Sequence, residues 1–276
     1  MTAAPTPEVA AAVPAEMMAR VRDQLAALAR EEDVQVLLAV ESGSRAWGFP
    51  SPDSDYDIRF IYVRPAEWYV SVHPGRDVIE APLDGTIDLN GWDLRKALGL
   101  MLKGNAVLVE WLTSPVTYGA VPGFRDGLAG LALRHTRRLS FVHHYLHLGE
   151  AMRENRQLRR ERWPIKKYFY TLRPAAALRW LRLHGAGRLP PMHFPTLVAQ
   201  CGLAPATEAL IADLVARKAV TRELGDTAAI PELEAFIDEE FAAARARLGG
   251  PEAPRDLGLA ADADRFLRRW AFGREG

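Results

Sequence analysis

A segment of strict alternation that begins at Asp55 constrains the fold of this chain more than any other feature. Successive side chains of a β-strand point to opposite faces, so residues two apart share a face. Asp55, Asp57 and Arg59 therefore fall on one face, while Tyr56, Ile58 and the aromatic residues that follow fall on the other. The pattern predicts a strand with an apolar back and a charged front.

Three other segments also predict strands. Residues 34–40 form a short and nearly continuous apolar run, which fits a buried strand. Residues 77–80 and 86–92 are two further candidates, and Asp88 falls on the polar face of the second. These segments all lie in the first half of the chain, so a sheet is expected there.

Helical patterns fill most of the remaining chain. Apolar residues at helical spacing predict a helix over residues 16–30, and Asp93 is suited to cap the helix that follows it. The helices expected after Asn105 cover residues 107–112, 137–158, 164–183, 207–220 and 231–248. We therefore expect an α/β (α+β) fold in which a small α/β domain over residues 16–120 precedes a helical domain over residues 121–276. The Ala- and Pro-rich residues 1–15 predict a disordered lead-in.

The composition fits a globular protein with an ordinary core. Apolar residues make up 49% of the chain and charged residues 25%. No window of eighteen residues is apolar throughout, so no membrane span is expected. Cys201 is the single cysteine, which excludes an internal disulfide and suits a reducing compartment. A cytoplasmic location is therefore expected.

Asp55 and Asp57 form a chemically sensible metal site. Two residues at i and i+2 of a strand lie on one side with their Cα atoms roughly 6.5 Å apart. Carboxylates so placed can converge on two divalent ions roughly 3.5–4 Å apart, the arrangement that supports phosphoryl or nucleotidyl displacement. Surface strands also carry such pairs without function, so the pair alone is weak evidence.

A Gly-Ser pair upstream strengthens the interpretation. Gly43 and Ser44 directly follow the apolar segment 34–40 and precede an expected helix start. Glycine lets the backbone approach a ligand closely, and the N–H groups at a helix start favour phosphate. The Ser44 hydroxyl could add a hydrogen bond. A strand, a Gly-Ser pair, a turn-rich loop and Asp-x-Asp on a second strand form a far rarer pattern than any one part.

These motifs resemble a known signature. GSRAWGF at residues 43–49 and SPDSDYD at residues 51–57 are similar to the signature of the DNA polymerase-β nucleotidyltransferase superfamily. The closer resemblance is to the predicted nucleotidyltransferases associated with RNA ligases and RNA repair. Further matches are GWDLRKAL at 91–98, EWLTSP at 110–115 and KKYFYTLRP at 166–174.

The resemblance implies a mixed sheet with flanking helices, and two Mg²⁺ (or Mn²⁺) ions held by three carboxylates. Asp55 and Asp57 match the first two carboxylates. Asp88 is the preferred third because it lies on the polar face of a strand. Asp93 is better explained as a helix cap, and Glu80 is the remaining alternative.

The resemblance also implies a set of nucleotide-binding residues. They are Gly43, Ser44 and Arg45 in the loop, and Lys166, Lys167 and Arg173 in the helical domain. One lysine of the pair is expected to contact the β,γ-phosphates, although a solvent-facing pair is the simpler reading. Arg45 could equally form a surface ion pair.

The expected activity is transfer of a nucleoside monophosphate from a nucleoside triphosphate, such as ATP, to an acceptor hydroxyl, with release of pyrophosphate. Residues 134–188 hold fourteen Lys or Arg against three Glu, which favours RNA as the acceptor. Partner proteins from RNA repair are also expected. A small molecule or a protein remains an alternative acceptor. A non-catalytic nucleic-acid-binding or antitoxin-like protein of the same fold is the alternative function.

Overall fold

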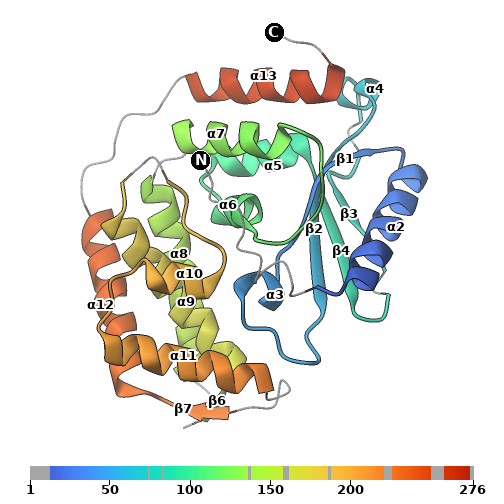
Figure 1. Ribbon diagram of the computed structural model, residues 1–276. Helices are drawn as coiled ribbons and strands as arrows, with labels where there is room; N and C mark the ends of the chain where they lie inside the picture. Colours follow the sequence, from blue (N-terminus) through green and yellow to red (C-terminus); the bar gives the residue numbers. More distant parts are fainter. Residues whose placement is uncertain are drawn as a thin grey trace. The chain divides into compact units, whose positions relative to one another are not determined.

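A computed structural model describes residues 13–73, 75–82, 84–135, 138–157, 162–185, 188–220, 226–249 and 258–273. The chain divides into two compact units. Unit 1 comprises residues 1–46, 55–136 and 255–276, and unit 2 comprises residues 47–54 and 137–254. Each unit has its own layers and core (Figure 1).

Unit 1 is built on a five-stranded mixed sheet with the strand order β3-β4-β2-β1-β5. Its strands are β1 (Gln35–Glu41), β2 (Tyr56–Val63), β3 (Val78–Glu80), β4 (Ile87–Asp93) and β5 (Thr117–Ala120). β2 and β4 are parallel, whereas β1 is antiparallel to β2 and to β5, and β3 is antiparallel to β4. The expected α/β fold class, the mixed sheet and the four predicted strands are confirmed. β5 was not predicted, because its four residues carry no clear alternation.

Helices cover both faces of this sheet (Figure 1). They are α2 (Ala15–Glu31) on one face, and α5 (Leu94–Leu102), α6 (Ala106–Thr113) and α7 (Phe124–His135) on the other. The short helices α3 (Ser44–Trp47) and α4 (Ala66–Tyr69) lie in the connections. Val21 and Leu25 of α2 pack in one apolar cluster with Tyr56, Ile58 and Phe60 of β2. The apolar back of β2 is thus buried as its alternation predicts.

Unit 2 is mainly helical. Its helices are α8 (Arg138–Gln157), α9 (Ile165–Leu183), α10 (Phe194–Ala199), α11 (Pro205–Val220) and α12 (Pro231–Leu248). A small antiparallel ladder joins β6 (Arg162–Pro164) to β7 (Asp226–Ala228). α8, α9 and α12 pack against one another. α8, α9, α11 and α12 match the predicted helices, except that Pro164 is the N-cap of α9 rather than its first helical residue. The short helix α10 was not predicted.

The compact units do not follow the predicted boundary at residue 120. The segment 121–136, which contains α7, and the C-terminal helix α13 (Gly258–Phe272) both belong to unit 1. Aromatic side chains explain this, because Phe124 of α7 contacts Phe266 and Trp270 of α13 at ring distances of 5.8 and 5.0 Å. Most of the predicted lead-in over residues 1–15 lies outside the described residues.

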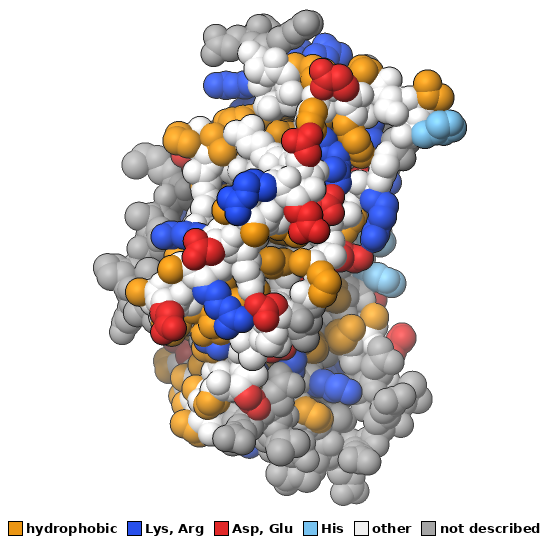
Figure 2. Space-filling view, turned by 90° about the vertical axis from the view of Figure 1, so that its right-hand side faces the viewer, with side chains coloured by type: hydrophobic (Ala, Val, Ile, Leu, Met, Phe, Trp, Pro, Cys, Tyr) orange, Lys and Arg blue, Asp and Glu red, His pale blue; other side chains and the backbone are white. Residues whose placement is uncertain are grey.

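The surface on the α2 side mixes charges of both signs. Figure 2 shows basic and acidic side chains interspersed there, with no broad area of one sign. Such a face gives little reason to expect a polyanion to bind on it. No described helix combines the length with the apolar character that crossing a bilayer requires.

Candidate active site

Asp57 and Asp88 lie side by side at one end of the sheet. β2 and β4 are parallel, and their register pairs Asp57 with Asp88. The Arg59 guanidinium lies between the two carboxylates, with Nη2 2.8 Å from Asp88 Oδ2 and 3.4 Å from Asp57 Oδ1. All three side chains are partly exposed. The pair of carboxylates thus already holds one cation at hydrogen-bonding distance.

The rest of this face of the sheet is covered by helices. Trp92 at the far end of β4 packs against Trp111 of α6, with the ring centres 4.0 Å apart. Ile61 of β2 is fully buried, whereas Asp57 and Arg59 on the same face are only half-buried. The charged end of the face therefore stays accessible while the apolar end is packed.

Asp55 precedes β2 and is exposed. Its backbone carbonyl accepts a hydrogen bond of 3.2 Å from Arg45 Nε. The Arg45 guanidinium also lies 3.8 Å from the centre of the Tyr56 ring, a cation–π contact. Arg45 is thus held beside the start of β2, next to Asp55, which lies two residues before Asp57. Among the described residues, no three acidic, His or Cys side chains form a ready-assembled metal cage.

Gly43 is in direct contact with Asp57. A Cβ atom added at Gly43 would lie 1.7 Å from Asp57 Oδ2 and 2.6 Å from its Cγ. The backbone on either side is also joined, since Ser42 N donates to Asp57 O at 2.8 Å. Ser44, at the start of α3, is half-buried. The close approach requires glycine, so the two halves of the motif form one local structure.

Glu41 is a site residue that the sequence analysis missed. It ends β1 and is fully buried, and its carboxylate accepts hydrogen bonds from Gly43 N, Asp57 N and Tyr118 Oη. Burial raises the pKa of this carboxyl above its ordinary value, and the hydrogen bond from Tyr118 opposes that rise. The available signal was an acidic residue at the end of a buried apolar strand, two residues before the Gly-Ser pair.

The two alternative third carboxylates lie elsewhere. Asp93 is the last residue of β4 and caps α5, with its carboxylate accepting from Arg95 N at 2.8 Å and from Tyr69 Oη at 2.7 Å. Burial raises the pKa of the Asp93 carboxyl. Glu80 lies on β3 and pairs with the Arg76 guanidinium at 2.9 Å. Asp88 is therefore the alternative that lies beside Asp57, and the predicted capping role of Asp93 is confirmed.

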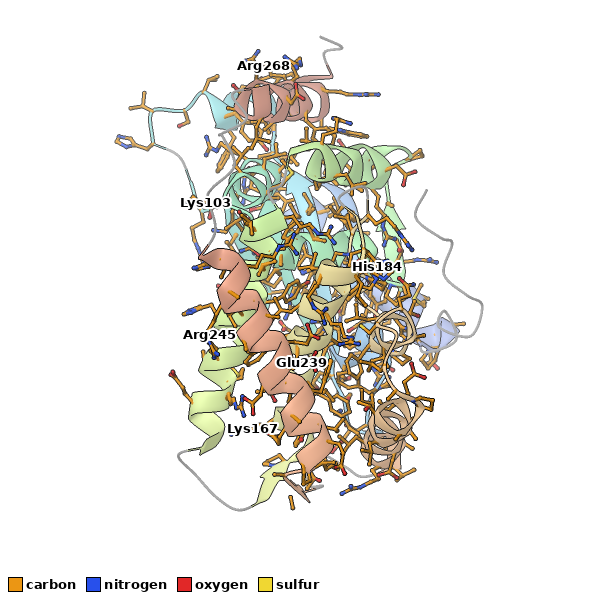
Figure 3. The ribbon with its side chains drawn as sticks, turned by 90° about the vertical axis from the view of Figure 1, so that its left-hand side faces the viewer. Lys103, Lys167, His184, Glu239, Arg245 and Arg268 are labelled. Atoms are coloured by element: carbon orange, nitrogen blue, oxygen red, sulfur yellow. The ribbon has the colours of Figure 1, made fainter. Side chains whose placement is uncertain are left out.

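The candidate phosphate-binding residues of unit 2 differ in exposure. Lys166 and Lys167 lie in the first turn of α9, where Lys166 is half-buried and Lys167 is exposed (Figure 3). Arg173 is buried, and its guanidinium lies 4.7 Å from the centre of the Trp47 ring. The contact with Trp47 was not predicted. Lys167 is the most accessible of the three.

Several basic side chains of residues 134–188 form interactions within unit 2. Arg179 and Arg182 of α9 both pair with the buried Glu240 of α12, at 2.9 and 2.7 Å. Arg153 of α8 pairs with Asp238 of α12. In Figure 3, α12 lies in front of α8 and carries the labelled Glu239 and Arg245. The acidic residues of α12 thus offset part of the positive charge counted in the sequence.

Known proteins similar to this chain point to one family. Residues 17–269 match the family described as "RlaP: RNA repair pathway DNA polymerase beta family". The uncharacterized protein YcgL of Bacillus subtilis (strain 168) is 40% identical over 225 residues, covering 82% of this chain and 85% of that protein. A nucleotidyltransferase-like protein from Exiguobacterium sibiricum 255-15 aligns over 93% of this chain and 81% of its own, at 13% identity. The TM-score of this alignment is 0.31.

Proposed function

The chain belongs to the RNA repair pathway DNA polymerase beta family, and from that premise we propose that it transfers a nucleoside monophosphate from a nucleoside triphosphate to an acceptor hydroxyl. Pyrophosphate is the second product. The observation that carries the proposal is the parallel register of Asp57 and Asp88, which puts two carboxylates side by side at the accessible end of the sheet.

The residues at this end suit Mg²⁺ or Mn²⁺. Both ions prefer oxygen ligands and commonly take a few carboxylates together with substrate phosphates. Asp57 and Asp88 hold the Arg59 guanidinium between them, so their oxygens face a cation. Asp55, exposed at the start of β2, is the further carboxylate in this proposal. Metal ions bound there would neutralise phosphate charge and lower the pKa of the acceptor hydroxyl.

Residues around the carboxylates would bind and orient the substrates. The Gly43–Ser44 turn packs against Asp57, so its backbone and the Ser44 hydroxyl would face the triphosphate. Asp88 would accept a hydrogen bond from the attacking hydroxyl and assist its deprotonation. Lys167, exposed in the first turn of α9, is proposed to contact the β,γ-phosphates.

RNA is the acceptor that we propose. The family description refers to an RNA repair pathway, and residues 134–188 are rich in arginine. Proteins of the same pathway are the proposed partners. The proposal therefore predicts a labelled RNA as the product rather than a labelled protein or small molecule.

The experiment is to incubate the protein with each α-³²P-labelled nucleoside triphosphate, total RNA and Mg²⁺ or Mn²⁺. We expect label to pass to RNA from one or more triphosphates, only when a metal ion is present. Asp57→Asn and Asp88→Asn should abolish the transfer. Asp84→Asn is the matched control, because Asp84 is an exposed aspartate of the same unit that pairs with Arg20.

Two results would contradict the proposal. One is a folded Asp57→Asn protein that keeps most of the activity. The other is wild-type protein that shows neither transfer nor metal-dependent binding of any triphosphate. The second result would favour a non-catalytic binding protein. Label on a protein or a small molecule instead of RNA would keep the transferase and change its acceptor.

A further inference from the structure

Glu41 joins the two halves of the candidate site. Its side chain is 0% exposed, and both of its carboxylate oxygens accept hydrogen bonds. Oε1 accepts from Asp57 N at 2.8 Å and from Gly43 N at 3.3 Å, and Oε2 accepts from Tyr118 Oη at 2.6 Å. One oxygen atom therefore holds two backbone segments that are fourteen residues apart in the sequence.

The Glu41 carboxylate accepts a hydrogen bond from Asp57 just beyond the end of the β1–β2 backbone ladder. The antiparallel pairing of β1 and β2 runs from Gln35 opposite Val63 to Glu41 opposite Ile58. Beyond it, Ser42 N still donates to Asp57 O at 2.8 Å, but Asp57 N donates to the Glu41 carboxylate instead of a backbone carbonyl. The chain can thus leave the ladder for the Gly-Ser turn without leaving the Asp57 N–H unsatisfied.

Glu41 is itself fixed from its other side. Its backbone N–H donates to Val116 O at 3.1 Å, and its carbonyl accepts from Ser114 Oγ at 2.6 Å. Together with Tyr118, these contacts anchor Glu41 to β5 and the segment before it. The carboxylate is therefore a rigid point against which Gly43 and Asp57 are held.

We propose that Glu41 is a positioning residue that sets the separation between the Gly-Ser turn and the Asp57 carboxylate. The inference rests on the proposed function, in which these two groups bind phosphate and metal. Glu41 does not act as a metal ligand, because its oxygens are buried and already accept three hydrogen bonds. It acts through Asp57. Burying a carboxylate without hydrogen-bond donors costs folding free energy. The three donors around Glu41 offset that cost.

Substitutions at Glu41 separate positioning from charge. Glu41→Gln keeps the size of the side chain, and its amide oxygen can accept from Gly43 and Asp57 while its NH₂ group donates to the Tyr118 oxygen. Glu41→Asp keeps the charge, but its side chain is one methylene shorter and cannot reach all three donors. Glu67→Gln is the matched control, because Glu67 is an exposed glutamate of the same unit in the first turn of α4.

Two measurements report on positioning without relying on turnover. The first is the affinity for Mn²⁺ alone, measured by electron paramagnetic resonance. We expect Glu41→Gln to stay within about 3-fold of wild type, and Glu41→Asp and Glu41→Ala to bind about 10- to 100-fold more weakly. Glu67→Gln should bind Mn²⁺ as wild type does. The second is amide hydrogen exchange, which should speed up at Gly43 and Asp57 in Glu41→Asp and Glu41→Ala but not in Glu41→Gln.

The outcomes decide the proposal even if one variant does not fold. If Glu41→Ala is unfolded, the comparison of Glu41→Asp with Glu41→Gln still applies. Equal Mn²⁺ affinity in wild type, Glu41→Asp and Glu41→Gln would overturn the proposal, and so would equal losses in Glu41→Gln and Glu41→Asp. Wild-type protein that binds no Mn²⁺ would instead refute the proposed function. Unchanged exchange at both amides in Glu41→Asp would refute the positioning role by itself.

Discussion

Replacing Gly43 with alanine tests whether the Gly-Ser turn and Asp57 form one rigid arrangement. The added methyl group would lie 1.7 Å from Asp57 Oδ2, whereas real Cβ atoms essentially never approach another heavy atom within 3.0 Å. Either the carboxylate or the turn must therefore move by more than about 1 Å. The clash also involves the Asp57 Cγ and Cβ atoms, so rotating the carboxylate alone does not relieve it.

The displacement has two measurable consequences. Overpacking of this kind costs about 1–3 kcal/mol of folding free energy, which thermal or denaturant unfolding can detect. A misplacement of about 1 Å in a reacting group can lower turnover about 100-fold. We therefore expect Gly43→Ala to fold, to bind Mn²⁺ more weakly and to transfer nucleotide about 100-fold more slowly.

Gly99→Ala is the matched control for this substitution. Gly99 lies inside α5, and a Cβ atom there would meet nothing within 4 Å. Alanine should therefore be tolerated or stabilise the protein by about 0.5–1 kcal/mol, because glycine is unfavourable within a helix. Wild-type Mn²⁺ affinity and turnover in Gly43→Ala would refute the reasoning, since they would mean that the contact with Asp57 has no functional effect.

Three other substitutions give separate tests. Arg59→Gln removes the cation between Asp57 and Asp88, so calorimetry should show Mn²⁺ binding about 10-fold more tightly; weaker binding would contradict competition between the two cations. Asp93→Ala removes the cap of α5, so thermal unfolding should show a loss of about 1 kcal/mol in folding free energy while activity persists. Lost activity in the folded protein would make Asp93 a candidate metal ligand again. Lys167→Ala should weaken triphosphate binding by about 1.5–3 kcal/mol but leave monophosphate binding unchanged. Lys103 is exposed and is the control, so Lys103→Ala should change neither affinity. Equal losses for both nucleotides in Lys167→Ala would indicate structural damage.

Local patterns were sufficient to predict much of unit 1. The alternation that begins at Asp55 identified β2 and its buried face, and Asp93 was identified as a cap from its place before an apolar helical pattern. Asp88 was selected because it lies on the polar face of the strand predicted over residues 86–92. What the sequence could not provide was the register, because the pairing of Asp57 with Asp88 depends on which strands are neighbours.

Residues that act across the fold were harder to predict. Glu41 meets Asp57 and Tyr118 only because β1 lies between β2 and β5 in the sheet. The assignment of α13 to unit 1 depends on contacts of Phe266 and Trp270 with Phe124, more than 140 residues earlier in the sequence. Neither relation leaves a periodic signal in the sequence, since both are set by tertiary packing.

The number of basic residues in 134–188 overstates the positive charge that this segment can offer to RNA. Arg179 and Arg182 of α9 form ion pairs with the buried Glu240 of α12, so these arginines hold the two helices together. A buried carboxylate that lost either arginine would be poorly compensated, which ties these residues to stability. Binding to an RNA backbone depends on the number of phosphates that are neutralised, and arginines already paired with carboxylates contribute less to that number. The RNA surface proposed for unit 2 would therefore rely on exposed cations such as Lys167 and Arg188, and it would be smaller than the fourteen basic residues of the segment suggest.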